Sequence, residues 1–489
     1  MSKENFAVGK ADTPGNNDEI NSNVFHVHGK LQLSTLPDEL LLRIFKLLVH
    51  SDLSSLMLLN KKFSNLASDP VLWQHYQIPA MDIAQLFGLD VLGKVLQLPR
   101  FSKLQVLDLS RILGGERRKN CLKEPDSASS QQFQEILVTA SSLPLKKLDL
   151  SYNNLAGLPT PDLLSRLVLR IQHVELVATF RSKVGRGDDW SINHQILSDI
   201  LEGISVNSSL RTLNLSCCEL EGLPLFLIAK LKFLSNVSLE GSFMTTKQAR
   251  VLLIEMGKGT KIIKLDLGCE SIIAVETLGD ALERVEPEVV AMALNNVEYL
   301  IYHRVYKTNR FRTDVHLSAF LEEMGRKTKL KKFMMKENNY IRVDPGVVGK
   351  AFNKLEYIEF QPNSSITRAQ IVEILNQMAL NTNVVGLKFV YEDIFWLNPD
   401  LLAKAVVQVE QVDMLCKMYS THILAILEHL DANSKIRRLN LGSNDLSKVP
   451  ENVLTKAVDV IRKNGGTVFV RKNQMKTLIS YSNESLGFL

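Results

Sequence analysis

Cysteine is scarce in this sequence, and the few that occur form no recognisable pattern. The 489 residues include five cysteines, an odd number, and no two of them are spaced as Cys-x-x-Cys. They are Cys121, Cys217, Cys218, Cys269 and Cys416. This count and spacing argue against a disulfide framework and against a cysteine-rich zinc site. Free thiols persist in reducing compartments, so we expect a cytoplasmic or nuclear protein.

Long apolar runs and a strong excess of one charge are also missing. No run approaches the roughly 18 apolar residues that a membrane-spanning helix needs, and the first residues lack the apolar core of a signal peptide. Lysine and arginine total 58 against 53 aspartates and glutamates, a formal net charge of +5. This excess is too small to indicate a general nucleic-acid binder. We therefore expect neither a membrane nor a nucleic acid among the partners.

The sequence also lacks the motifs that carry common catalytic chemistry. Neither the HExxH metal motif nor the G-x-S-x-G nucleophile turn occurs. The segment 346–350 resembles a phosphate-binding loop, but Ala351 stands where serine or threonine would bind magnesium, and Asp344 replaces the first glycine. We expect Cys217 and Cys218 to fill a structural turn. The chain is thus expected to have no catalytic residue, no metal and no other cofactor.

The composition changes sharply near residue 34. Residues 1–33 are rich in asparagine, glycine, aspartate and serine, and such a segment cannot bury enough surface to offset its ordering entropy, so we expect a disordered tail. Residues 34–80 instead carry many large apolar side chains. Pro37 and the acids Asp38 and Glu39 suit the first turn of a helix. Ser51 is expected to cap a second helix.

The region 34–80 therefore predicts a compact helical module of about 45 residues, near the lower size limit for independent folding. Its apolar residues wrap most of the first helix and do not form one narrow stripe. This excess predicts that a partner or the following domain covers part of the surface.

From Leu104 to Val470 a short pattern recurs, in which two apolar residues, usually leucine, flank one further residue. The spacing averages about 30 residues, in or just above the range of leucine-rich repeats. Asparagine or cysteine follows the clearest copies, at Asn153, Cys218 and Asn444, where the side chain can satisfy backbone groups of a turn. The expected strands are 107–109, 148–150, 174–176, 213–215, 237–239, 265–267, 300–302, 333–335, 358–360, 387–389, 412–414, 439–441 and 468–470.

Two repeat types alternate along 81–472. One continues into a proline-containing turn and a helix rich in leucine and alanine; the other continues into a polar turn, often with threonine or glutamine, and a helix rich in isoleucine and leucine. The expected fold class is α/β, a small helical module followed by a curved solenoid with about thirteen parallel inner strands and outer helices. Residues 473–489 are expected to form a C-terminal tail.

The module at 34–80 contains Leu36-Pro37-Asp38-Glu39-Leu40-Leu41, Ile44-Phe45, Leu53, Phe63 and Leu72-Trp73. This set of residues is similar to the F-box consensus, and the repeats resemble the ribonuclease-inhibitor type of leucine-rich repeat. The later repeats depart from the consensus at Tyr302, Met335 and Phe360. The chain thus resembles F-box/leucine-rich repeat proteins, the substrate receptors of SCF-type cullin–RING ubiquitin ligases.

The resemblance implies that the F-box docks on a Skp-type adaptor, which links it to a cullin and a RING protein. The repeats would then present a protein substrate for ubiquitination and proteasomal degradation. A second interpretation stays open, in which some of the expected contacts only fill the core of the module. By resemblance, the adaptor contacts would be Leu36, Pro37, Leu40, Ile44, Phe45 and Leu48.

Side chains between and beside the two apolar residues of each strand should line the concave face. In the early repeats they are small and polar, whereas in the middle repeats they are aromatic, apolar and basic. Such a mixture is typical of interfaces and predicts the substrate-binding surface. The alternative is that divergence of the repeats has placed these side chains together without a ligand. The predicted surface comprises Tyr299, Ile301, His303, Lys332, Met334, Lys336 and Tyr357.

Two insertions follow strands of the same repeat type, at Arg181–Trp190 and His303–Asp314. The second carries basic and aromatic residues that suit an acidic or phosphorylated partner, and a solvated loop explains it equally well. The leading hypothesis is a non-catalytic substrate receptor. The runner-up is a leucine-rich repeat scaffold or inhibitor that binds a protein without directing its ubiquitination.

Overall fold

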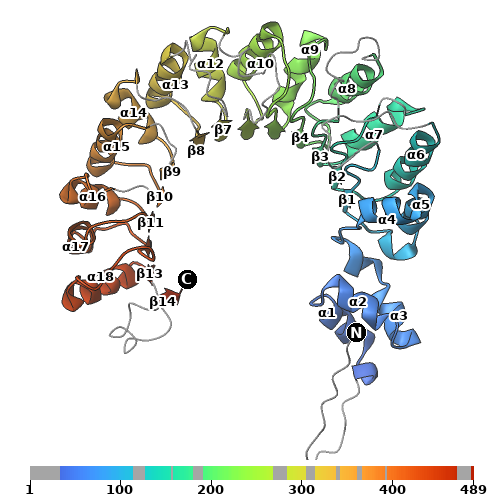
Figure 1. Cartoon of the computed structure of the whole chain (residues 1–489), viewed down its shortest axis with the longest axis horizontal. Helices are drawn as coiled ribbons and strands as arrows, with labels where there is room; N and C mark the ends of the chain where they lie inside the picture. The colour runs from blue at the N-terminus through green and yellow to red at the C-terminus, as the bar shows by residue number, and fades with distance from the viewer. Residues whose placement is uncertain are drawn as a thin grey trace, which may run out of the picture. The chain divides into compact units, whose positions relative to one another are not determined.

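The computed structural model describes residues 33–113, 127–155, 158–179, 191–267, 284–303, 314–336, 342–360, 366–390, 394–470 and 486–488. Nearly all of the expected N-terminal tail and of both insertions, and most of the expected C-terminal tail, lie outside these residues. The chain divides into two compact units between Leu72 and Trp73. Each unit is described by itself (Figure 1).

Short helices make up the N-terminal unit. In chain order they are η1 (Leu33–Thr35), α1 (Asp38–Phe45), α2 (His50–Leu56), α3 (Lys61–Ala67) and η2 (Pro70–Trp73), whose last residue belongs to the second unit. The expected cap at Ser51 is wrong, because α2 already begins at His50 and its N-cap is Val49, which has no polar side chain. Asn60 caps α3 instead, and its Oδ1 accepts a hydrogen bond from the Phe63 amide at 2.9 Å.

Apolar side chains from the three α-helices meet in the core of this unit. Leu41 and Phe45 of α1 are fully buried, together with Leu53 of α2. The rings of Phe45 and Phe63 meet edge to face with 5.8 Å between their centroids, an arrangement that aromatic pairs favour. Phe45 therefore belongs to the core, as the second interpretation of the F-box residues allowed.

The described residues of the second unit form one sheet of fourteen parallel strands, ordered along the chain from β1 to β14. Pairing keeps equivalent apolar residues in one row, with Leu107 beside Leu148 at one end and Leu439 beside Val468 near the other. All thirteen expected strands are present, whereas β14 lies in the expected C-terminal tail and was not predicted. The strands are β1 (Val106–Asp108), β2 (Lys147–Asp149), β3 (His173–Glu175), β4 (Thr212–Asn214), β5 (Asn236–Ser238), β6 (Lys264–Asp266), β7 (Tyr299–His303), β8 (Lys332–Lys336), β9 (Tyr357–Phe360), β10 (Gly386–Val390), β11 (Gln411–Leu415), β12 (Arg438–Asn440), β13 (Thr467–Val470) and β14 (Leu486–Phe488).

Helices connect the strands and cover the convex side of the sheet, while the strands line the inner edge (Figure 1). Two helices, α4 (Ala80–Phe87) and α5 (Leu89–Leu96), precede β1, and α5 packs against the first connecting helix. The core lies between the sheet and the helices, where the strand leucines are buried. The other helices are η3 (Pro99–Phe101), α6 (Ser127–Ser141), α7 (Pro161–Arg170), α8 (Ser191–Gly203), α9 (Leu225–Ile228), η4 (Ala229–Phe233), α10 (Thr246–Lys258), α12 (Pro287–Leu294), α13 (Asp314–Arg326), α14 (Pro345–Phe352), α15 (Arg368–Leu380), α16 (Pro399–Val406), α17 (Ser420–Glu428) and α18 (Glu451–Lys463).

The predicted role of asparagine and cysteine at the turn after the strand is confirmed. Asn153 is fully buried, and its Nδ2 donates to the carbonyl oxygens of Leu109 and Leu150 at 2.8 Å each. Asn444 donates in the same way to a carbonyl of the preceding repeat. Side chains with other donor groups take this position in further repeats, and sequence patterns identified only the cysteine among them: Thr179, Cys218 and Ser242.

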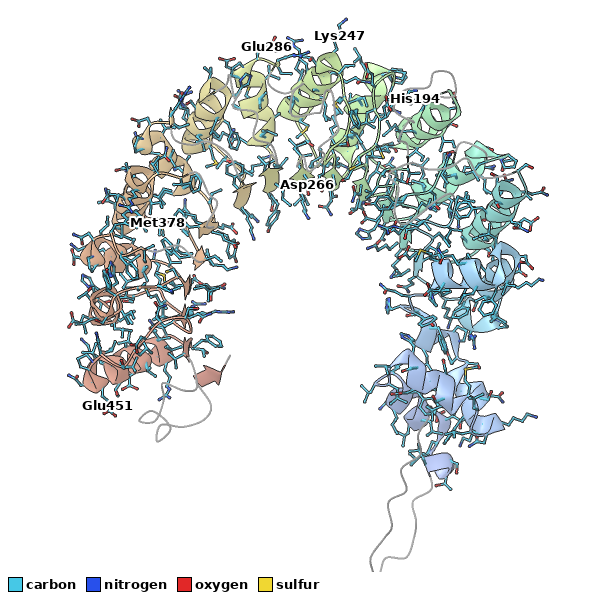
Figure 2. All side chains as sticks on the ribbon, in the orientation of Figure 1. His194, Lys247, Asp266, Glu286, Met378 and Glu451 are labelled. Atoms are coloured by element: carbon cyan, nitrogen blue, oxygen red, sulfur yellow. The ribbon has the colours of Figure 1, made fainter. Side chains whose placement is uncertain are left out.

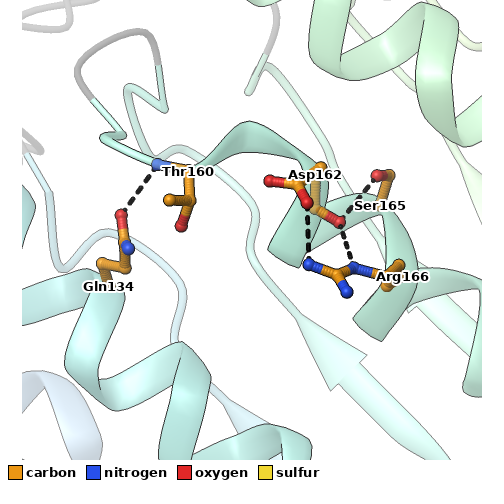
Figure 3. A network of polar contacts seen from close by, with 5 residues as sticks. All are labelled: Gln134, Thr160, Asp162, Ser165 and Arg166. Carbon is orange, nitrogen blue, oxygen red and sulfur yellow. Dashed lines mark hydrogen bonds and ion pairs between the residues drawn. The ribbon is translucent and has the colours of Figure 1, made fainter.

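Alternate helices begin at a proline. Helices α7, α9, α12, α14, α16 and α18 start at or directly after one, because the ring fixes a helical φ and the first turn needs no N–H donor. At the start of α7 (Figure 3), Gln134 of α6 accepts a hydrogen bond from the Thr160 amide at 2.9 Å. In the next turn Arg166 pairs with Asp162 at 2.7 Å. The bond from Thr160 to Gln134 thus links the start of α7 to α6, whereas the ion pair lies within α7.

Four of the helices that alternate with these proline-start helices have glutamine or histidine as their third residue. The side chain of this residue forms a hydrogen bond with the turn before a neighbouring proline-start helix, which we call a proline-type turn. The Nε2 of Gln248 in α10 donates to the carbonyl oxygens of Leu220 and Leu223 at 2.7 and 2.8 Å. A carbonyl can only accept, so the histidines that make the same bond carry their proton on Nε2. The equivalent bonds run from His316 to Val285 at 2.6 Å, from Gln370 to Val343 at 2.8 Å and from His422 to Leu397 at 2.8 Å.

We expect His422→Leu to lower the free energy of unfolding by about 1–3 kcal/mol, because it leaves the buried carbonyl of Leu397 without a donor. His422→Gln should cost much less, since glutamine fills the equivalent position in α10 and α15. Urea unfolding followed by circular dichroism measures both losses. Equal losses in the two variants would show that packing, and not the hydrogen bond, is what matters there.

Candidate protein-binding surfaces

The N-terminal unit leaves large apolar side chains exposed. Leu40 of α1 is 44% exposed, and Leu47 and Leu58, which follow α1 and α2, are 85% and 87% exposed. Val49 and Leu59, in the same two turns, are also exposed. Sequence reasoning named Leu40 as a contact and missed the other four, because leucine and valine in helical turns look the same whether they are buried or not.

The other residues predicted to contact an adaptor are accessible to different degrees. Pro37 is exposed, and Leu36, Ile44 and Leu48 are half-buried. Phe45 alone of the predicted set is fully buried. The accessible members lie on and around α1.

Lys62 of α3 holds the segment in front of α1. Its Nζ donates to the carbonyl oxygens of Ser34 and Leu36 at 3.0 Å each, and it forms an ion pair with Asp38 at 3.1 Å. The pair is partly exposed, so its Coulomb energy is small. The three contacts nevertheless fix the position of Leu36 and Pro37 relative to α3.

The inner face of the repeat unit follows the alternation of side chains along each strand. The strand leucines are buried, and the residues before and between them lie on the opposite face. Figure 2 shows Asp266 of β6 at this inner edge, whereas Lys247 of α10 and Glu286, just before α12, lie at the outer edge. The character of the inner face changes along the sheet.

Acidic side chains dominate the inner face at β1 to β3. Asp108, Asp149 and Glu175 lie side by side in register. Together with the segment 78–82 they line a pocket of about 520 Å³. Burial raises the pKa of Asp149, and the charges of Asp108 and Glu175 raise it further, while hydrogen bonds from Ser151 act in the opposite direction.

Strand pairing brings the predicted substrate-binding residues together on β7, β8 and β9. Three rows result, because each residue of β7 pairs with its counterpart on β8. The first row continues onto β9. The rows are Tyr299, Lys332 and Tyr357; Ile301 and Met334; and His303 and Lys336.

The side chains of the first row are open to solvent. Tyr299 and Tyr357 are 36% and 38% exposed, and Lys332 is half-buried, as is Ile301 of the second row. The side chains of three further members lie outside the described part of the structure, as does the basic loop 304–313. These three are His303, Met334 and Lys336.

The described residues contain no group of three or more histidine, cysteine, aspartate or glutamate side chains placed to hold a metal ion. In the same part of the chain, no helix is both long and apolar enough to cross a membrane. The described thiols Cys217, Cys218 and Cys416 form no disulfide, and the last two are buried.

We expect Asp149→Asn to raise the melting temperature at neutral pH. The raised pKa means that the folded chain disfavours the carboxylate relative to the unfolded chain; this penalty is fully present above the folded pKa and disappears below the ordinary value of 3.8. Asparagine fits the site, because Asn214 accepts a hydrogen bond from the Ser216 amide at 2.9 Å, as Asp149 does from Ser151. Thermal unfolding at neutral and acidic pH should show a gain that shrinks on acidification. No gain at neutral pH would contradict this account.

Comparisons with known proteins agree with this organisation. Residues 33–78 match the F-box-like family model, and residues 144–167 and 206–223 match leucine-rich repeat models. No curated protein matches the chain. One similar solved structure is the leucine-rich repeat-containing protein LegL7 from Legionella pneumophila, at 12% identity and a TM-score of 0.33, over 74% of this chain and 91% of that chain. By the family-model matches, this chain joins an F-box-like domain to leucine-rich repeats, the domain organisation of an F-box/leucine-rich repeat protein.

Proposed function

We propose that the chain is the substrate-recognition subunit of an SCF-type ubiquitin ligase in the cytoplasm or nucleus. The observation that carries this proposal is the F-box-like domain with its exposed apolar side chains, among them Leu40, Leu47 and Leu58. Exposed apolar patches of this kind mark interaction sites. A Skp-type adaptor that covers this surface would tie the chain to a cullin and a RING protein.

The leucine-rich repeats would hold the protein to be ubiquitinated. A concave parallel sheet offers a long row of side chains at regular spacing, which suits the binding of another protein. The chain itself would hold its partners and carry out no chemical step. A repeat scaffold or inhibitor is the second candidate, and adaptor binding separates the two, because a scaffold of that kind needs no F-box contact.

Replacing both Leu36 and Pro37 by alanine should reduce co-purification of a Skp-type adaptor roughly tenfold or more, since two apolar contacts near the start of α1 are lost. Lys61→Ala, at an exposed position of α3, is the matched control and should bind as the wild type does. Co-expression followed by quantitative pull-down measures both. Circular dichroism and the melting temperature must be unchanged in the double variant. Wild-type adaptor recovery with this folded variant would rule out the proposed contact.

Ubiquitin transfer to a bound substrate should require the cullin and the RING protein, because the chain would contribute binding alone. A reconstituted reaction with the activating and conjugating enzymes and this chain should give no product until the adaptor, cullin and RING protein are added. Product formed by the chain with only the two enzymes would show that it is catalytic after all.

A further inference from the structure

Lysine and tyrosine alternate across the inner face of the middle repeats. Adjacent strands are about 4.8 Å apart, so lysines or tyrosines on every second strand are separated by about 10 Å. We call Lys264, Tyr299, Lys332 and Tyr357 the Lys–Tyr row. Strand pairing sets the following residues of β6 to β10 side by side: Lys264, Tyr299, Lys332, Tyr357 and Gly386.

Gly386 gives the ring of Tyr357 a defined place on the sheet. A Cβ atom at Gly386 would lie 2.5 Å from Cδ1 and 2.8 Å from Cε1 of Tyr357. The ring therefore covers the position where any other residue would carry its side chain. It is still 38% exposed. A ring that is already held against the sheet loses little conformational freedom when a partner binds it.

The two lysines of the row have no counter-ion in the described part of the chain. No carboxylate there lies within ion-pair distance of Lys264 or Lys332, whereas Lys388 in the adjacent row is paired with Glu359 at 3.2 Å. Lys264 is exposed and Lys332 is half-buried. The hydroxyl groups of Tyr299 and Tyr357 likewise form no hydrogen bond with another described residue. The row thus offers two cations and two hydroxyl donors that have no ion-pair or hydrogen-bond partner among the described residues.

We propose that the Lys–Tyr row binds an acidic segment of a partner protein in extended conformation. In an extended chain of the polyproline II type, with three residues per turn and a rise of about 3.1 Å per residue, two acidic residues three positions apart lie on the same face about 9 Å apart, close to the spacing of Lys264 and Lys332. Tyr299 and Tyr357 supply ring surface beside them, and tyrosine is enriched in interfaces and among their strongest contacts. The identification of this partner as the substrate rests on the proposed function, whereas the binding itself does not.

The test is a selection of random peptides of about ten residues, displayed on phage, against the full-length chain; such a peptide is long enough to cross the row. Peptides recovered on the wild type should be enriched in aspartate and glutamate, with pairs spaced three apart. A synthetic copy of the most enriched peptide, labelled with fluorescein, then gives affinities by anisotropy. Its binding should weaken as salt is raised, since the lysines are partly exposed.

The decisive variant reverses the charges of the two lysines. Lys264→Glu with Lys332→Glu should weaken binding of the labelled peptide roughly tenfold or more. Lys247→Glu with Lys456→Glu makes the same change of charge at exposed positions of α10 and α18, outside the row, and should leave affinity unchanged within about twofold. A pair of tyrosine variants, Tyr299→Ala with Tyr357→Ala, should lose affinity at an unchanged melting temperature.

Two results would overturn the proposal: no enrichment of acidic residues on the wild type, or equal affinities for the reversed and control variants. Lys264→Gln with Lys332→Gln keeps the test valid if charge reversal disturbs folding, because it removes the cations without adding acids. Adaptor pull-down is run on the same variants. Failure here with intact adaptor binding rejects only the Lys–Tyr row, whereas acidic-peptide binding without adaptor binding rejects only the ligase assignment.

Discussion

Backbone groups at the turns need hydrogen-bond partners, and the repeat unit depends on how the sequence supplies them. Every coil bends before and after its helix, and a buried carbonyl left without a donor costs about 1–3 kcal/mol. Asn153 and Asn444 supply donors after the strand, and Gln248 and His422 supply them at the start of the next helix. Where donor and acceptor come from different repeats, as from Asn153 to Leu109 and from Gln248 to Leu220, the bond also joins neighbouring coils. The curved sheet and its row of inner side chains follow from this stacking.

The N-terminal unit is under a different constraint, which is its size. A module this small can bury only a few large side chains, and Leu41, Phe45 and Leu53 are among those in its core. Leu47 and Leu58 are left in the turns, where they remain in contact with water. The same residue types thus serve the core and the accessible surface. Lys62 holds the segment before α1 in place by hydrogen bonds to backbone carbonyls. Polar contacts, and not apolar burial, therefore position this segment.

The strands and their order could be predicted because burial of two apolar residues around one polar residue repeats along the chain. The same alternation predicted which strand residues face the inner side, namely those between and beside the two apolar residues. It also predicted that Tyr299 and Lys332 lie together. Other features depend on contacts that no local pattern encodes. Phe45 matches a consensus equally well as a core or a surface residue, and the ring of Tyr357 meets Gly386 only once the strand register is fixed. The strand β14 was missed because it lies in the expected C-terminal tail, although Leu486 and Phe488 keep the spacing of the two apolar residues.

The alternation of helix starts has a consequence for the length of the solenoid. Proline-type turns take donors from helices that begin without proline, as Leu397 does from His422 and Val343 does from Gln370. Removal of one repeat would place two helices of the same type next to each other. One proline-type turn would then lose the donor side chain of the neighbouring helix. The smallest piece that can be added or removed without breaking this pairing is two repeats. Duplication is therefore expected to lengthen such a domain by an even number of repeats. Each such step adds two strands to the inner face.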